Sequence, residues 1–345
     1  MKPPLSTSIP YLDGWRGLAI LLVLYAHFSL AAGGELGVAM FFVLSGYLVS
    51  GLLFGQETGI ATFFWRRATR ILPTFWLYLA VMAWYAAAVQ PVPYTVPLKE
   101  MGATLAFLRT YLPPGQSIWS APWPIGHVWS LNVEEHAYLL LALVAVLARA
   151  CGSQRAKGVI RLVLFGCIGA MCVTIIYYSR IPPAGASPWM LRSECAALGL
   201  VASAWIRVMR PLTRVALVRT GHWAITPLAL CAGLLCYAPG APYLASPGLA
   251  PLLLAVAINY LDAAPMLLQR IMSLKLLRWF GLSSFSMYMW QQPFYKAIAT
   301  GLPRGIALAC ALVTGAVAFY LFEQPVRRYL NRVWLNVRRA PLVDA

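Results

Sequence analysis

Apolar segments long enough to cross a bilayer recur along the whole of this 345-residue sequence. A helix of about 20 apolar residues spans the hydrocarbon core. Hydrophobic residues make up 61% of the chain and charged residues only 11%, which is typical of a polytopic membrane protein. We therefore expect a single all-α domain over 1–345 with about ten spans, near 12–30, 36–55, 71–90, 127–148, 159–179, 188–206, 222–238, 248–262, 279–299 and 303–323.

The basic residues predict how these spans are oriented. The net charge of +17 could indicate a nucleic-acid-binding protein, but the basic residues sit in short clusters between apolar segments. If the N-terminus is cytosolic, basic residues at cytosolic ends outnumber those at outer ends by about four to one, as the positive-inside rule requires. The sequence thus predicts that both termini are cytosolic and that no nucleic acid is bound.

Two segments are expected to lie outside the spans. Residues 91–126 are rich in proline and aromatic residues, and they predict an outer cap with a short helix near Met101–Tyr111. Residues 326–345 place apolar side chains on one helical face and arginines on the other. This pattern predicts a cytosolic tail whose amphipathic helix lies flat on the inner leaflet, in contact with membrane lipids.

The first apolar segment, Leu12–Phe28, contains three ionisable side chains. Such groups cost several kcal/mol within a membrane unless they are paired or solvated, so they suggest a functional site. Arg16 and His27 are eleven residues apart and share a helix face, with His27 about 16 Å deeper, and Asp13 could pair with Arg16. A packed structural histidine and a cleaved signal peptide are the alternatives.

Two further segments could carry chemistry. Arg66, Arg67 and Arg70 follow the second span, where arginines among aromatic residues can bind either phosphate groups or lipid headgroups. At the start of the fourth span, Ser130, Glu134 and Tyr138 share one helical face. We expect Glu134 to lie near the depth of His27 and to orient its imidazole as a base.

The sequence predicts no metal site. His127 and His136 are nine residues apart and lie on opposite helical faces, and nothing in this stretch has the i, i+4 spacing of paired ligands. The seven cysteines form no CxxC pair.

Five stretches together resemble the acyltransferase-3 family of integral membrane acyltransferases, and they occur in the order that is typical of the family. They are LDGWRGLAILLVLYAHF, with the family's Arg-x10-His pattern, GVAMFFVLSGYLVS, FFWRRATRILPTFW, HVWSLNVEEHAYLLL, and FSMYMWQQP followed by FEQP. The resemblance implies acyl transfer to extracytoplasmic carbohydrates in a bacterial inner membrane. It also implies that Arg16 and His27 are the essential pair, that Arg66, Arg67 and Arg70 meet the phosphates of coenzyme A, and that Glu134 is the signature acid.

The chain departs from the family pattern in two places. Gln291 stands where many relatives have histidine, so no base is supplied from that position, and Ala137 replaces the usual aromatic residue after the acidic pair. The hydrolase-like domain of longer relatives is not expected here, so acceptor chemistry should occur in the membrane domain.

The sequence therefore predicts an acetyl-CoA-dependent O-acetyltransferase. We expect His27, Glu134 and Arg16 to be catalytic and a tunnel to join the arginines to His27 beneath the cap. A proton-coupled transporter of saccharide or lipid-linked intermediates and a non-catalytic partner in polysaccharide assembly are the alternatives. The acceptor, the acyl chain length, an acyl-histidine relay and the oligomeric state stay open. The residues expected to bind the acceptor are Asp13, Ser130, Trp129, Glu135 and Tyr138.

Overall fold

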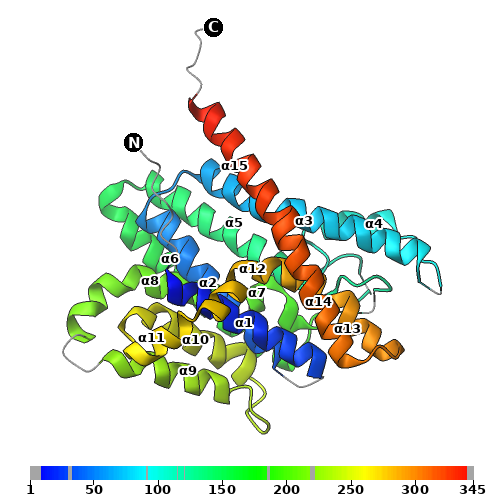
Figure 1. Cartoon of the computed structure of the whole chain (residues 1–345). Coiled ribbons are helices and arrows are strands. Elements are labelled where there is room, and N and C mark those ends of the chain that lie inside the picture. The colour runs from blue at the N-terminus through cyan, green and yellow to red at the C-terminus, as the bar shows by residue number, and fades with distance from the viewer. Residues whose placement is uncertain are drawn as a thin grey trace.

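The computed structural model describes residues 9–29, 33–90, 92–114, 116–119, 121–184, 187–217 and 222–339, and in these residues the fold is all-α (Figure 1). The helices are α1 (Pro10–Ser29), α2 (Gly34–Ser50), α3 (Ile60–Ala88), α4 (Leu98–Leu105), α5 (Trp129–Ala150), α6 (Ser153–Arg180), α7 (Ser193–Ala196), α8 (Leu198–Leu217), α9 (Ile225–Leu235), α10 (Ala250–Asn259), α11 (Met266–Met272), α12 (Lys275–Trp290), α13 (Gln292–Ala297), α14 (Arg304–Ala318) and α15 (Gln324–Arg339).

Five helical segments are long and apolar enough to cross a membrane: Gly34–Gly55, Ile60–Ala88, Gly126–Ala150, Ser153–Arg180 and Arg304–Asn336. Of the other predicted spans, the first is the unbroken 20-residue helix α1, which carries Asp13 and Arg16, and several others are short or broken. The segment predicted at 279–299, for example, is divided between α12 and α13 at Gln291. The all-α class is thus confirmed, while the number of full-length spans is smaller than the ten expected from apolar runs.

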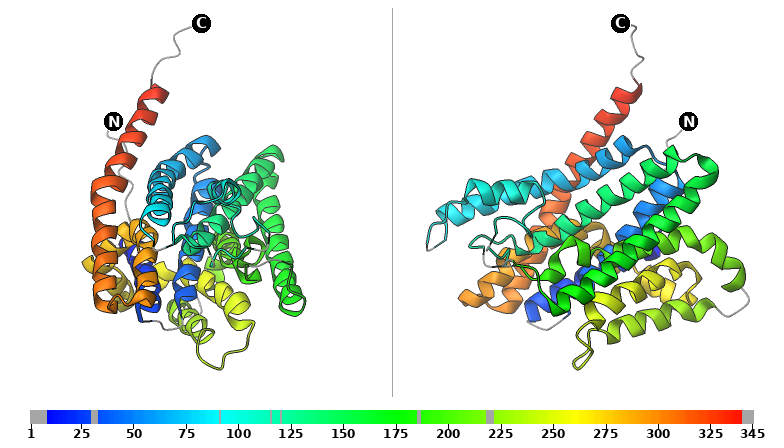
Figure 2. Two further views of the ribbon diagram at one scale, coloured as in Figure 1. Left: turned by 90° about the vertical axis from the view of Figure 1, so that its right-hand side faces the viewer. Right: turned by 180° about the vertical axis from the view of Figure 1, so that it is seen from behind.

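Helix α1 lies inside the bundle and packs against α2 and α12 (Figures 1 and 2). Glycines allow α1 and α12 to approach closely. A Cβ atom on Gly17 would lie 1.9 Å from the carbonyl oxygen of Leu277, and one on Gly281 would lie 1.8 Å from that of Asp13. Only glycine fits such contacts, which are common between membrane helices because small residues let backbones pack together.

Two helices differ from the sequence-based prediction. Helix α3 begins at Ile60, so Arg66, Arg67 and Arg70 lie on its first turns and not in a loop. Helix α15 continues α14 through a π-helical turn at Phe319–Glu323, and Figure 1 shows one long helix that projects beyond the bundle. The C-terminal helix thus follows α14 without a connecting loop, and its contact with the inner leaflet stays a prediction. The indole of Trp334 on α15 stacks on Trp65 of α3 at 4.7 Å.

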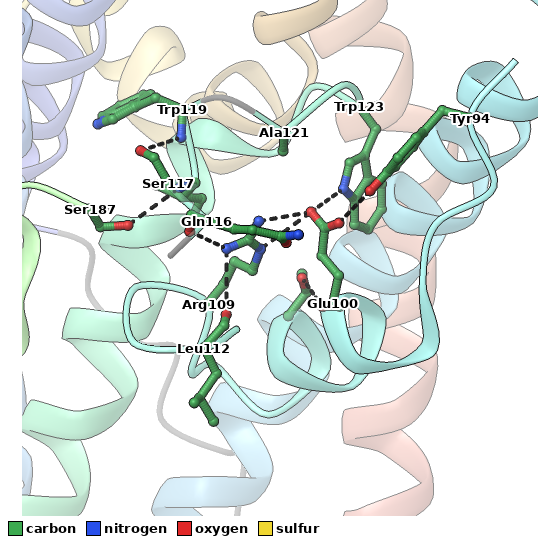
Figure 3. Close-up of polar contacts among 12 residues, drawn as sticks. Tyr94, Glu100, Arg109, Leu112, Gln116, Ser117, Trp119, Ala121, Trp123 and Ser187 are labelled. Atoms are coloured by element: carbon green, nitrogen blue, oxygen red, sulfur yellow. Dashed lines mark hydrogen bonds and ion pairs between the residues drawn. The ribbon is translucent and has the colours of Figure 1, made fainter. Parts of the chain in front are cut away.

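The predicted cap, 91–126, folds around a buried ion pair (Figure 3). Its short helix is α4, somewhat earlier than expected. Glu100 and Arg109 are each 1% exposed, and Arg109 Nη2 donates to Glu100 Oε1 at 2.9 Å. Trp123 Nε1 donates to the same oxygen at 2.9 Å, and the Tyr94 hydroxyl donates to Oε2 at 2.7 Å. Burial alone raises the pKa of Glu100, but these hydrogen bonds and the Arg109 charge together lower it.

Arg109 also binds the backbone of the central part of the cap. Its Nη1 donates to the backbone carbonyls of Gln116 at 3.1 Å and Leu112 at 3.4 Å (Figure 3). A buried guanidinium with several acceptors fixes the path of a chain that contains little regular structure.

We predict that Glu100→Gln lowers the free energy of unfolding by about 3–5 kcal/mol, because Arg109 would remain buried without a counter-ion. The lowered pKa of Glu100 means that its carboxylate stabilises the fold above the pKa of an unfolded glutamate, about 4.3. That contribution is lost as the pH falls through the lower folded pKa. Unfolding in detergent at pH 7 and near pH 3 measures both effects.

The matched control is Glu57→Gln, which changes an exposed glutamate. It should alter stability by less than about 0.5 kcal/mol. Equal stability of the two variants would show that the ion pair does not hold the cap.

Candidate active site

Four arginines line one cavity of about 250 Å³, which we call the arginine cavity. Arg66, Arg67 and Arg70 come from the start of α3, and Arg16 comes from α1. Apolar side chains of α2 complete much of the wall, among them Phe41, Leu48 and Val49. The cavity thus combines several positive charges with an apolar interior, a combination that suits an anionic ligand with an apolar arm.

The four arginines are not equivalent. Arg67 Nη2 donates to Glu134 Oε2 at 2.6 Å and its Nε donates to Glu135 Oε1 at 2.8 Å, while its guanidinium lies 3.7 Å from the centre of the Tyr138 ring. In the described part of the chain no ion pair is formed by Arg66 or Arg70. Arg67 is therefore committed to the fold, and the other two guanidinium groups can bind an anion.

Arg16 is paired within its own helix. Its Nη1 lies 3.5 Å from Asp13 Oδ1, which confirms that these two residues can pair, and its side chain is mostly buried. Asp13 Oδ2 has no hydrogen-bond partner among the described residues. Asp13 does not line the cavity, so it is placed to hold Arg16 and not to bind an acceptor directly.

His27 lines a second cavity of about 510 Å³, which also includes His127 and which we call the histidine cavity. Its Nδ1 lies 2.7 Å from Gln291 Oε1, and the phenol ring of Tyr295 stacks on the imidazole at 4.5 Å. Its Nε2 faces Gly34, where an added Cβ would lie 3.7 Å away. One ring nitrogen is held by the protein, and the other lies beside a residue that lines the cavity.

The structure does not place Glu134 against His27, contrary to our expectation. The hydrogen bonds of Glu134 join it to Arg67 and to Ser45, whose hydroxyl donates at 2.9 Å. Glu134 lines the arginine cavity. The residue that contacts the His27 ring nitrogen is Gln291, which the sequence pattern marked only as a missing histidine.

The two cavities adjoin, because Val38 and Tyr288 line both of them. The Tyr288 hydroxyl donates to the backbone carbonyl of His127 at 2.9 Å and lies 2.8 Å from Ser130 Oγ. Tyr288 therefore stands on the partition between the arginines and His27. The predicted tunnel corresponds here to two cavities that meet at these two side chains.

Ser130, Glu134 and Tyr138 share one face of α5 as the spacing predicts, but this face lines the arginine cavity and not the cavity of His27, where the sequence analysis expected it. Trp129 lines the histidine cavity, and Glu135 lines neither. Of the acidic pair, Glu134 is thus the one that faces a cavity. In the described residues no group of three or more His, Cys, Asp or Glu could hold a metal ion.

Several residues of the histidine cavity were missed by the sequence analysis. Glu35 of α2 is the carboxylate among its described lining residues, and Trp119, Tyr237 and Tyr243 add aromatic surface. These residues come from the start of α2, the cap and the α9–α10 connection. Tertiary contacts alone bring them together, so no local pattern could have found them.

A family model described as an acyltransferase domain, that of the acyltransferase-3 family, matches residues 9–322. The chain is 25% identical over 352 residues to the peptidoglycan O-acetyltransferase OatA of Listeria monocytogenes, and the match covers 93% of this chain and 56% of that protein. It is 30% identical over 147 residues to the O-acetyltransferase OatA of Staphylococcus aureus, which covers 39% of this chain and 24% of that protein. The chain thus spans about half the length, or less, of these curated relatives. No solved structure matches it.

We predict that Arg67→Met destabilises the protein, because it leaves Glu134 and Glu135 buried without a counter-ion. Removing one partner of a buried ion pair costs about 3–5 kcal/mol. Thermal unfolding in detergent measures the loss. Arg66→Met, which removes an exposed arginine of the same helix, is the matched control and should unfold like the parent protein. Equal stability of both variants would assign Arg67 to ligand binding alone.

Proposed function

Because the chain belongs to the acyltransferase-3 family, we propose that it transfers an acetyl group from cytosolic acetyl-CoA to a hydroxyl group of a carbohydrate outside the membrane. The observation that supports this proposal most strongly is the pair of adjoining cavities. One has arginines for the phosphates of the donor, and the other has an oriented imidazole for the acceptor.

The donor fits the arginine cavity by charge and length. Arg66 and Arg70 supply guanidinium groups for charge-assisted, bidentate contacts with phosphate oxygens, and Arg16 adds a third positive charge deeper in the wall. The helical rise from Arg16 to His27 is about 16 Å. An extended pantetheine arm would cover this distance by passing Val38 and Tyr288, with the nucleotide remaining on the cytosolic side.

The reaction that we propose uses His27 as the general base. Its Nε2 takes the proton of the acceptor hydroxyl while the hydroxyl oxygen bonds to the thioester carbonyl carbon. The carbon–sulfur bond then breaks, and the proton passes from the imidazolium to the thiolate, which leaves as coenzyme A. In the relay version, Nε2 attacks the thioester carbon, the carbon–sulfur bond breaks and coenzyme A leaves as a thiolate. The acceptor hydroxyl then attacks the acetyl carbon, the bond to Nε2 breaks, and the hydroxyl proton neutralises the thiolate.

The acceptor fits the histidine cavity. Trp119, Trp129 and Tyr243 offer aromatic faces on which sugar rings can stack, and Glu35 offers a hydrogen-bond acceptor. The relative from Listeria monocytogenes, a peptidoglycan O-acetyltransferase, suggests that the acceptor is a cell-wall saccharide. The acceptor is therefore expected on the side of the membrane that the cap covers.

We predict that His27→Ala lowers the rate of acetyl transfer by about 10²–10⁴-fold, the usual contribution of a general base. The assay uses purified protein in vesicles, with radiolabelled acetyl-CoA on the arginine side and a cell-wall saccharide on the other. Acetyl-CoA binding should be unchanged, because His27 does not line the arginine cavity.

The control is His136→Ala, because His136 bonds to Ser193 and lines neither cavity. This variant should retain the rate. A well-folded His27→Ala protein with normal turnover would remove His27 from the mechanism. A saccharide that crosses the vesicle membrane without acetyl-CoA consumption would favour a transporter.

We predict that Arg66→Ala and Arg70→Ala each weaken acetyl-CoA binding. Loss of one charged phosphate contact costs about 1.5–3 kcal/mol, or roughly ten- to a hundredfold in affinity. Calorimetry in detergent with wild type and variants measures this change, and the difference should shrink at high salt. Arg155→Ala, at an exposed arginine outside the cavity, is the control. Unchanged affinity in both variants would assign these arginines to lipid headgroups.

A further inference from the structure

The imidazole of His27 is held on two sides by a single helical turn. Gln291, at the break between α12 and α13, contacts Nδ1 at 2.7 Å, and Tyr295 stacks on the ring face at 4.5 Å. These two residues are four apart, and the backbone N–H of Tyr295 donates to the carbonyl of Gln291 at 3.2 Å. The edge and the face of the ring are thus fixed by the same rigid element.

In the orientation in which Gln291 directs Oε1 toward the ring, this contact selects one tautomer of His27, and the Gln291 amide nitrogen then has no hydrogen-bond partner among the described residues. An amide oxygen can only accept a hydrogen bond, so Nδ1 must carry the hydrogen when it contacts Oε1. In a neutral imidazole the other nitrogen, Nε2, then carries the lone pair. Nε2 is the atom that lies beside Gly34 at the histidine cavity.

Gln291 cannot act by touching the substrates. Its side chain is 0% exposed, and it lines neither cavity. The carboxylate that the sequence suggested for this role, Glu134, is bound to Arg67 in the other cavity. In the described residues, the group that contacts Nδ1 of His27 is therefore the uncharged side-chain amide of Gln291.

We propose that Gln291 is the positioning residue of the catalytic histidine, holding His27 in the tautomer whose Nε2 can accept a proton or an acetyl group. This inference rests on the proposed role of His27 as base, but the tautomer can be measured without any turnover. The corresponding role in triads belongs to a buried carboxylate, and the wrong tautomer there lowers the rate about 10⁴-fold.

The first test is nuclear magnetic resonance of wild-type protein labelled with ¹⁵N-histidine, at about pH 8.5, where an ordinary imidazole is neutral. The chain has four histidines, and the signals of His27 are those absent from His27→Ala. We expect a hydrogen on Nδ1 and none on Nε2. A hydrogen on Nε2 would overturn the proposal, whether or not the protein transfers acetyl groups.

The second test is kinetic and uses Gln291→Met, which keeps the length of the side chain but removes the acceptor. We expect kcat to fall about 10- to 100-fold, less than the roughly 10²–10⁴-fold that a general base contributes, because His27 itself remains. The KM for acetyl-CoA should stay constant, because the arginine cavity is untouched. The His27 signals should then show both tautomers.

A double-mutant cycle separates positioning from a structural role. In the His27→Ala background, Gln291→Met should not lower the residual rate further, because the two residues act as one unit. An additional fall of the same size as in the parent protein would mean that Gln291 acts through the fold, and an unchanged kcat in Gln291→Met alone would also refute the proposal. If His27→Ala leaves the rate unchanged but the tautomer is as expected, the proposed function fails while the contact stands.

Discussion

The contact between Gly17 and Gly281 fixes how α1 and α12 are aligned along their lengths, and so which of their residues meet at the candidate active site. At these glycines the α1 and α12 backbones approach more closely than any side chain would allow. His27 lies ten residues after Gly17, and Gln291 lies ten residues after Gly281. Two parallel helices that start in register rise by the same distance, about 15 Å, so the imidazole meets the amide. A displacement of α12 by one residue would separate them.

Most of the charged side chains named above are paired inside the bundle. Membrane interiors tolerate charged side chains when they are paired, and here Asp13 faces Arg16 while Glu134 and Glu135 share Arg67. The acidic residues of α5 therefore stabilise the wall of the arginine cavity. Arg66 and Arg70 remain available to a ligand, so the net charge of the cavity stays positive.

Local periodicity predicted the helices, the Asp13–Arg16 pair and the common face of Ser130, Glu134 and Tyr138, because these depend on residues three or four apart. It did not predict which helices become neighbours. The pairs Arg67–Glu134 and His27–Gln291 are 67 and 264 residues apart in sequence. Apolar helices can pack in many arrangements, so a carboxylate at the right depth was assigned to the wrong partner. Helices α9 and α10 are shorter than the spans predicted at 222–238 and 248–262, because an apolar run does not mark where a helix begins and ends.

Val38 and Tyr288, which stand between the two cavities, bear on whether ions can leak through the bundle. A bacterial membrane stores energy as a gradient of protons and charge, and each elementary charge carries about 2.3 kcal/mol per 100 mV. A permanently open aqueous channel through the bundle would dissipate that store. Two cavities separated by a valine and a hydrogen-bonded tyrosine can instead admit a slender organic arm from one side. In the mechanism proposed above, the arm would itself fill the space between the cavities, so that delivery of a two-carbon group would not require ions to leak.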